Sequence, residues 1–245
     1  MAEGRPTSSG GTDFDDWKET YTETIMRAVP FLREKHDFFV QTKAEELLEL
    51  VEDRLGPPRQ LRFLDVGCGI GLVHHHLVPR VGRLEGADIA EGSIEYARAG
   101  NPDVEYHVYD GERLPHDAAI VDVAFSMGVV HHIRPERWQA FLAELVRVTR
   151  PGGLVALVEP NLLNPVCRLG AARCEFDQGA SFLRAKKLRQ LARAAGLKDV
   201  EVDYILFVPF RMAGRRAVER RLRWLPVGAQ YIVSGRVTGT ERLPK

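Results

Sequence analysis

The hydrophobic residues of the chain fall into short apolar runs separated by amphipathic stretches from residue 61 onward. The apolar runs predict strands at Leu61–Val66, Leu84–Ile89, Val104–Val108, Val121–Ser126 and Leu154–Val158. The stretches between them predict helices at Leu72–Leu77, Gly92–Ala99 and Pro135–Val148. Strands and helices that alternate in this way are typical of a mostly parallel sheet with helices on both faces. The pattern therefore predicts an α/β fold.

The two ends of the chain are less regular. Residues 1–12 are rich in Gly, Ser and Thr, and we expect them to be disordered. Apolar residues recur near helical spacing up to Leu55, and Gly56 ends that run. Residues 160–181 contain Pro, Asn and Gly and look like an insertion. Beyond it the pattern predicts a helix at Arg184–Ala195, a strand at Val200–Val208, a basic helix at Arg211–Trp224 and a last strand at Ala229–Val233.

Composition and charge narrow the setting. The 245 residues are 44% hydrophobic, and their formal net charge of zero does not favour a nucleic-acid partner. The three cysteines are an odd number without C-x-x-C spacing, which argues against a disulfide framework or a zinc site and for a reducing compartment. The N-terminus lacks the apolar core of a signal peptide, and no window is apolar enough to span a membrane. We therefore expect a cytoplasmic protein.

One short stretch suggests a ligand site. Residues 63–71 read FLDVGCGIG, a buried strand that runs into glycines at alternate positions. Glycines permit a tight turn and let a ligand lie directly on the backbone. The stretch lacks the Lys and hydroxyl of a phosphate-binding loop, and Leu72 stands where a dinucleotide site would have its third glycine. Asp88 ends the next predicted strand about twenty residues on, where an acid can bind two ribose hydroxyls.

Five segments in order resemble the motifs of the class I S-adenosylmethionine-dependent methyltransferases. They are Leu64–Gly71, Gly86–Ile89, Tyr109–Gly111, Val121–Ile133 and Arg147–Gly153. The match covers roughly residues 60–160, and the chain looks like the small-molecule type found in ubiquinone and menaquinone biosynthesis. The resemblance implies a Rossmann-like sheet of seven strands, mostly parallel, with the last strand antiparallel.

The resemblance also implies a cofactor, S-adenosyl-L-methionine, which leaves as S-adenosyl-L-homocysteine. In relatives the backbone around Gly67, Cys68, Gly69 and Gly71 would border its methionine part, and Asp65 would orient the loop or hold the cofactor amine. By the same resemblance Asp88 would bind the ribose, Ile89 and Gly111 would lie beside the adenine, and Asp110 would accept from the adenine amino group. Met127 and Gly128 would lie beneath the sulfonium. Tyr21 would belong to an N-terminal lid. A turn or cap role is the alternative for each carboxylate, and an amphipathic helix packed on the core is the alternative for the aromatic residues near Tyr21.

Two histidines are the candidate catalytic residues. His131 and His132 follow the fourth predicted strand near the expected methyl position, and an imidazole can accept a proton near neutral pH. The alternative is a structural role for both, and His132 is the better candidate of the two. Some similar quinone-precursor methyltransferases carry acidic metal ligands at the positions of Gly128 and His131. Those acids are absent here, so we expect no metal.

The candidate acceptor-binding residues lie at and after the fifth strand. Glu159 could bind or deprotonate a polar acceptor, or could be satisfied by backbone donors. We also expect Asn161, Arg173, Phe176 and Asp177 to approach the acceptor, because loops on a rigid scaffold usually select the substrate.

Two further features have plain structural interpretations. His74, His75 and His76 are consecutive on a predicted helix and cannot converge on one ion, which favours a solvated helix face. The six arginines of residues 211–224 could contact an anionic membrane, but a solvated arginine-rich face is favoured.

The resemblance and the residues together predict one methyltransferase domain over residues 13–245. It would comprise a helical lid at 13–58, a cofactor-binding core at 59–160, a substrate-side insertion at 161–183 and a C-terminal helix and strand hairpin at 184–245. The predicted activity is methyl transfer to an O or N atom of a small molecule, in bacterial secondary metabolism or cofactor biosynthesis. The alternatives are a methyltransferase that acts on protein or RNA and a non-catalytic protein that binds the cofactor.

Overall fold

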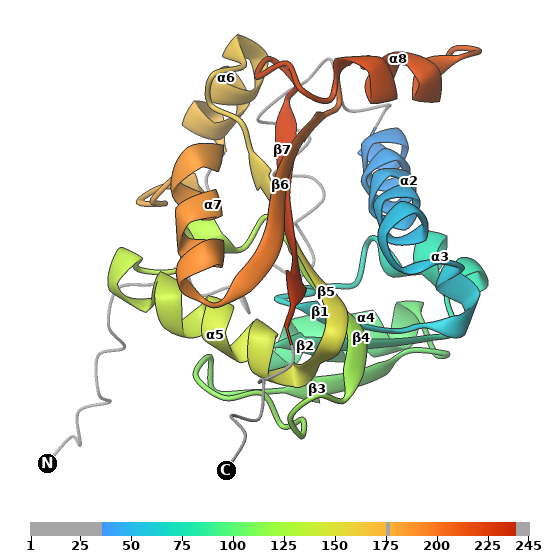
Figure 1. The fold of residues 1–245 in the computed structure, drawn as a ribbon, viewed down its shortest axis with the longest axis vertical. Helices are drawn as coiled ribbons and strands as arrows, with labels where there is room; N and C mark the ends of the chain where they lie inside the picture. The colour runs from blue at the N-terminus through green and yellow to red at the C-terminus, as the bar shows by residue number, and fades with distance from the viewer. Residues whose placement is uncertain (1–35, 175–176, 239–245) are drawn as a thin grey trace, which may run out of the picture.

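A twisted sheet forms the centre of the molecule (Figure 1). The computed structural model describes residues 36–174 and 177–238, and these residues form a seven-stranded sheet in the order β3-β2-β1-β4-β5-β7-β6. The strands are β1 (Arg62–Val66), β2 (Arg83–Asp88), β3 (Glu105–Val108), β4 (Val121–Met127), β5 (Thr149–Pro160), β6 (Leu197–Ile205) and β7 (Gln230–Val237). β7 pairs antiparallel with β5 and β6, and the other pairs are parallel. The predicted mostly parallel sheet with an antiparallel last strand is confirmed.

Helices cover both faces of this sheet, as predicted (Figure 1). They are α2 (His36–Leu55), α3 (His74–Leu77), α4 (Glu91–Gly100), α5 (Trp138–Val148), α6 (Pro165–Arg173), α7 (Ala185–Ala194) and α8 (Arg215–Leu222). Side chains of α2 and α4 pack in one apolar cluster with Phe63, and those of α5 and α7 pack in a second with Leu64. Successive strand residues point to opposite faces, so these two neighbours on β1 serve different cores.

The strand order reverses beside β1. The chain continues from β1 outward through β2 and β3, then returns to place β4 on the other side of β1. Ligands of open parallel sheets bind at such a reversal, outside the carboxyl ends of the strands. The turn after β1 and the loop after β4 both lie there, so the fold places the two candidate motifs side by side.

The boundaries of several elements differ from the predictions. The segment Pro151-Gly152-Gly153 was expected to separate a helix from a strand, but β5 already begins at Thr149. The pairing of β4 with β5 shifts register between Val121 and Val123, and Gly152 has a φ of +80°. The proline and glycines therefore form an irregularity within a longer strand. The insertion contains a helix, α6, whose first turn is capped by the Asn164 side chain through the N–H groups of Val166 and Cys167.

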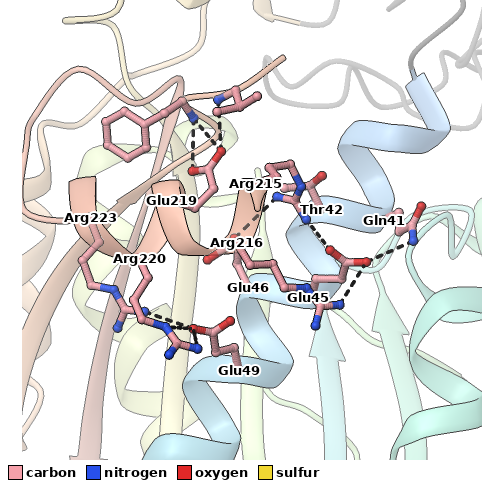
Figure 2. Close-up of polar contacts among 12 residues, drawn as sticks. Gln41, Thr42, Glu45, Glu46, Glu49, Arg215, Arg216, Glu219, Arg220 and Arg223 are labelled. Atoms are coloured by element: carbon pink, nitrogen blue, oxygen red, sulfur yellow. Dashed lines mark hydrogen bonds and ion pairs between the residues drawn. The ribbon is translucent and has the colours of Figure 1, made fainter. Parts of the chain in front are cut away.

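The arginine-rich segment forms a shorter helix than predicted and faces α2 (Figure 2). Its arginines pair with glutamates of α2: Arg215 with Glu45 and Glu46, Arg216 with Glu45, and Arg220 and Arg223 with Glu49. The prediction of a solvated face is wrong for Arg215, which is only 8% exposed. Glu219 on the same helix accepts from the backbone N–H groups of Phe207 and Val208, and so joins α8 to the end of β6. Among the described residues, no helix combines the length and apolarity needed to cross a bilayer.

We predict that Arg215→Met lowers the free energy of unfolding by about 3 kcal/mol, because it leaves the partly buried Glu45 and Glu46 short of a cation. Arg220→Met is the matched control on the same helix. The Arg220 side chain is 63% exposed, so we expect that loss to stay within about 1 kcal/mol. Urea denaturation of both variants measures the difference. Equal losses would contradict the assignment of Arg215 as the buried anchor.

Candidate functional site

The turn after β1 leaves its backbone open at the carboxyl edge of the sheet. Gly67 and Gly69 have φ values of +80° and +51°, a region that strains residues with a Cβ. A Cβ on Gly67 would lie 2.5 Å from the Val129 side chain, whereas a Cβ on Gly69 would meet nothing within 4 Å. Gly67 thus permits close packing against the loop after β4. Gly69 leaves one side of the turn open.

Asp88, at the end of β2, holds this turn in place. Its Oδ2 accepts from the Gly69 N–H at 2.7 Å and its Oδ1 from the Ala90 N–H at 3.0 Å. The Ala87 carbonyl accepts from the N–H groups of Gly67 and Cys68. Burial raises the pKa of Asp88. The turn role of Asp88 is therefore present in the structure, and the predicted ribose contact would use its remaining lone pairs.

Asp65 on β1 is buried and contacts an unexpected residue. The His74 Nε2 atom lies 3.0 Å from Asp65 Oδ2, and His74 is fully buried. The prediction of a solvated face for the three histidines is therefore wrong for His74, because this first residue of α3 points beneath the glycine turn. His75 and His76 instead contact Asp37 of α2, so the three rings do not converge.

Two segments meet on the side where the resemblance predicts adenine. Ile89 is 56% exposed, and a Cβ on Gly111 would lie 3.3 Å from its Cγ2 atom. Asp110 is exposed, and its Oδ1 accepts from the N–H groups of Glu112 and Arg113 at 2.8 Å. These backbone bonds lower the pKa of Asp110. Asp110 thus caps a turn, and its adenine contact stays a prediction.

The loop after β4 carries Gly128, whose N–H donates to the Val158 carbonyl, and then His131. The His131 Nδ1 atom lies 2.6 Å from Glu159 Oε2, and its Nε2 lies 3.5 Å from Asp177 Oδ1. Burial alone would lower the pKa of His131, but the Asp177 and Glu159 carboxylates outweigh it and raise the pKa to about 9. His131 is therefore protonated at neutral pH. A general-base role for it conflicts with this pairing.

His132 lies in the opposite situation. Burial and the positive charge of His131 lower the pKa of His132 to about 4, although the Asp177 carboxylate opposes this. The His132 Nε2 atom lies 3.8 Å from Asp177 Oδ1. A neutral imidazole and an imidazolium thus stand next to each other, with ring centroids 4.1 Å apart. His132 keeps the protonation state that a general base needs.

Glu159 and Asn161 have internal partners. Glu159 is buried, and its Oε1 accepts from the N–H groups of Val129 and Val130, while its Oε2 contacts His131. Asn161 is also buried, donates to the carbonyls of Pro226 and Gly228, and accepts from the Leu163 N–H. These contacts make Glu159 the anchor of the loop after β4. Asn161 connects the insertion to the segment before β7. Acceptor binding by Glu159 or Asn161 therefore stays a prediction, and their contacts do not support it.

The remaining predicted residues are spread around the site. Asp177, from the insertion, reaches both histidines across the carboxyl edge. Arg173 is exposed at the end of α6, and Met127 ends β4. Phe176 and Tyr21 lie outside the described residues.

Three groups of the described side chains bring histidine nitrogens and carboxylate oxygens within 4.8 Å of one another: Asp37 with His75 and His76, Glu85 with His107 and His116, and Asp177 with His131 and His132. In the second group, Arg62 and Arg83 also bind Glu85 Oε1 at 3.2 and 3.1 Å. The bond from His116 and these cations hold the pKa of Glu85 near 2 despite burial. Glu85 therefore belongs to an internal network of ion pairs.

The sequence interpretation missed His74 and Tyr106, although a signal for the second was present. Gly86 stands in mid-strand opposite Tyr106, and a Cβ on Gly86 would lie 2.8 Å from the Tyr106 ring. A glycine inside a strand often marks such a close approach. His74 had no comparable signal, because its helix is a single short turn.

Comparisons with known proteins identify the family and the fold. The family model described as "Methyltransferase domain" matches residues 64–157. A ubiquinone biosynthesis O-methyltransferase from Rhizobium etli is 26% identical over 166 residues, which are 62% of this chain and 66% of the relative, so the match spans just under two thirds of that protein. A malonyl-[acyl-carrier protein] O-methyltransferase from Hahella chejuensis is 33% identical over 210 residues, covering 81% of this chain and 71% of the relative.

A solved structure shares the fold. The Thermotoga maritima protein described as a SAM-dependent methyltransferase, possible histamine N-methyltransferase, superposes with a TM-score of 0.64. It is 18% identical and covers 92% of this chain and 98% of its own. An identity this low supports the fold alone.

We predict that the His131 pairing makes stability depend on pH. The pKa of His131 in the folded protein, about 9, exceeds the ordinary value of 6.5, so its stabilising effect is complete below about pH 6.5 and is lost as the pH rises through 9. The loss should approach about 3 kcal/mol. Urea denaturation of the wild-type protein and of His131→Gln between pH 6 and pH 9.5 measures it as the change in their difference. A difference that stays constant over this range would show that His131 is not held as an imidazolium.

Proposed function

The chain belongs to the class I S-adenosylmethionine-dependent methyltransferases, and on this premise we propose that it methylates an acidic oxygen atom, a phenol or a carboxylic acid, of a small molecule. The observation that carries the proposal is the contact between two loops. The Val129 side chain packs on Gly67, so the loop with the two histidines lies against the glycine turn. A cofactor on the turn and an acceptor beside the histidines would then be neighbours.

The residues at the turn fit the cofactor of the family. The turn has an open side at Gly69, and Asp65 Oδ1 is buried without a hydrogen-bond partner among the described residues. When bound, S-adenosylmethionine supplies a methyl group on a positively charged sulfur. We propose that the turn holds its methionine part, Asp88 its ribose, and Ile89, Asp110 and Gly111 its adenine, with Met127 and Gly128 beneath the sulfur.

The histidine pair supports an acidic acceptor. His131 carries a positive charge at neutral pH, which favours an acceptor oxygen that is anionic or becomes so. His132 is neutral, but with a pKa of about 4 it is a weak base and can take a proton efficiently only from an acidic hydroxyl. Both curated relatives described above are O-methyltransferases by name. Alignment of the acceptor with the methyl group would supply most of the catalysis, roughly 7–11 kcal/mol of barrier.

A small-molecule acceptor also suits the rest of the chain. The net charge is zero, and the end of β4 with the loop after it reads SMGVVHHI, without an Asn/Asp-Pro-Pro-Tyr/Phe motif for nucleic-acid or amide substrates. We accordingly propose no nucleic-acid partner. Arg215 is buried against α2, and Arg216, Arg220 and Arg223 already pair with its glutamates, so we do not propose membrane contact through residues 211–224.

We predict that Gly69→Ala weakens S-adenosylhomocysteine binding at least about ten-fold, because the new Cβ would project where the ligand lies on the backbone. Gly196→Ala is the matched control. Gly196 also has a positive φ, +95°, and open space around a Cβ, but it precedes β6 at the opposite edge of the sheet. Both variants should lose about 1–2 kcal/mol of stability from backbone strain. Isothermal titration calorimetry that finds equal affinities would remove the turn from the cofactor site.

We predict that His132→Ala lowers turnover about ten- to a hundred-fold with a phenolic acceptor and much less with a carboxylate acceptor, which has no proton to lose. Cofactor affinity should stay nearly unchanged. A screen of phenols, carboxylic acids and amines with labelled methyl donor, read by mass spectrometry, first identifies the acceptor class. Transfer to amines alone, or to protein or RNA alone, would overturn the proposal of an acidic small molecule.

A further inference from the structure

A buried string of three polar side chains, Tyr106, His74 and Asp65, runs beneath the glycine turn, and only Asp65 has a part in the function proposed above. The Tyr106 hydroxyl lies 2.6 Å from His74 Nδ1, and His74 Nε2 lies 3.0 Å from Asp65 Oδ2. The three residues are 5%, 0% and 2% exposed. The rings of His74 and Tyr106 stack with centroids 5.4 Å apart. Polar groups buried this deeply are costly unless each has a partner.

The donors and acceptors of the string suit one direction of these hydrogen bonds. Burial raises the pKa of Tyr106, so its hydroxyl is protonated at neutral pH and can donate to His74 Nδ1. An Nδ1 atom that accepts leaves Nε2 as the protonated nitrogen of a neutral imidazole. His74 then donates from Nε2 to Asp65 Oδ2. The Tyr106 hydroxyl thus matches the tautomer of His74 that donates to one oxygen of the Asp65 carboxylate.

The other oxygen of that carboxylate remains to be satisfied. Asp65 Oδ1 is buried and has no hydrogen-bond partner among the described residues. A buried carboxylate oxygen costs free energy unless a cation or an N–H group donates a hydrogen bond to it. Lys43 of α2 is the cation that interacts with Asp65 electrostatically; burial lowers the pKa of Lys43, and the charge of Asp65 opposes this. Lys43 makes no hydrogen bond to Oδ1, so this atom can still accept one from a ligand.

The string also touches the turn itself. A Cβ on Gly71 would lie 2.7 Å from the Tyr106 hydroxyl and 3.1 Å from His74 Nδ1. The Asn101 amide donates to the Gly71 carbonyl on the same side. The last glycine of the turn is therefore packed directly on the string. The string thus links this glycine, through His74, to Asp65.

We propose that His74, with Tyr106 behind it, is a positioning residue that aims Asp65 Oδ1 at the α-ammonium group of the cofactor. The inference rests on the proposed function, because it requires S-adenosylmethionine or its product at the turn. Its own content is the assignment of His74 and Tyr106. The bond from His74 to Oδ2 fixes the orientation of the carboxylate and leaves Oδ1 as its one open acceptor, and a preorganised acceptor binds an ammonium group at a lower entropic cost.

Two ligands separate this role from a merely structural one. S-adenosylhomocysteine carries the α-ammonium group, whereas 5′-methylthioadenosine has the same adenosine and thioether without the amino-acid part. We expect His74→Phe to weaken binding of S-adenosylhomocysteine at least ten-fold and to change binding of 5′-methylthioadenosine less than two-fold. Tyr106→Phe, which removes only the hydroxyl, should act in the same direction by about three- to five-fold. Isothermal titration calorimetry of the full chain measures all affinities.

The controls keep the outcomes distinct. His75→Phe, on the same helix but with a half-exposed side chain, should leave both affinities unchanged. Thermal melting without ligand checks folding, and if His74→Phe does not fold, Tyr106→Phe carries the test. Equal loss of both ligands, or no loss of S-adenosylhomocysteine, would overturn the positioning role while leaving the proposed function intact. Wild-type protein that binds neither ligand would overturn the proposed cofactor site and this inference with it.

Discussion

The hydrogen bonds between the turn after β1 and the end of β2 hold the whole carboxyl edge of the sheet in order. The Ala87 carbonyl and the Asp88 carboxylate accept from three successive N–H groups of that turn, those of Gly67, Cys68 and Gly69. With its amides tied to β2, the turn can be open on one side and packed on the other, against Val129 and against the string that ends at Asp65. A turn without these ties would have the freedom that glycines bring, and no defined surface for a ligand.

A second set of charges holds the loop after β4 in place. Glu159 from the end of β5 binds the backbone of the loop after β4 and the ring of His131, and Asp177 reaches the same ring from the insertion. One imidazolium thus connects three segments that are far apart in the chain. The same arrangement forces His132 to stay neutral, because two adjacent imidazolium ions would repel each other. The proton on His131 therefore both holds these three segments together and keeps His132 neutral.

Much of the fold could be predicted from apolar periodicity. The parallel strands from β1 to β5 and the helices on both faces correspond to the predicted pattern within a few residues, whereas the antiparallel last strand was implied by the family resemblance. The approximate boundaries have a physical basis, since hydrogen bonds across the sheet decide where a strand ends. β5 extends back through a proline and two glycines because β4 pairs with it on both sides of a shift in register. A pattern within one segment carries no information on that partner.

The sequence by itself determined the glycine turn, the acid that follows β2 and the family to which they point, because backbone conformation and short spacings are local properties. Only the tertiary structure decided which polar side chains act together. The arginines of α8 would suit either water or the glutamates of α2, and three consecutive histidines would suit a solvated helix, until packing buried Arg215 and His74. The protonation of His131 depends on Glu159 and Asp177 in the same way. Burial and charge pairing are sums over neighbours that are distant in the chain, so no local pattern can supply them.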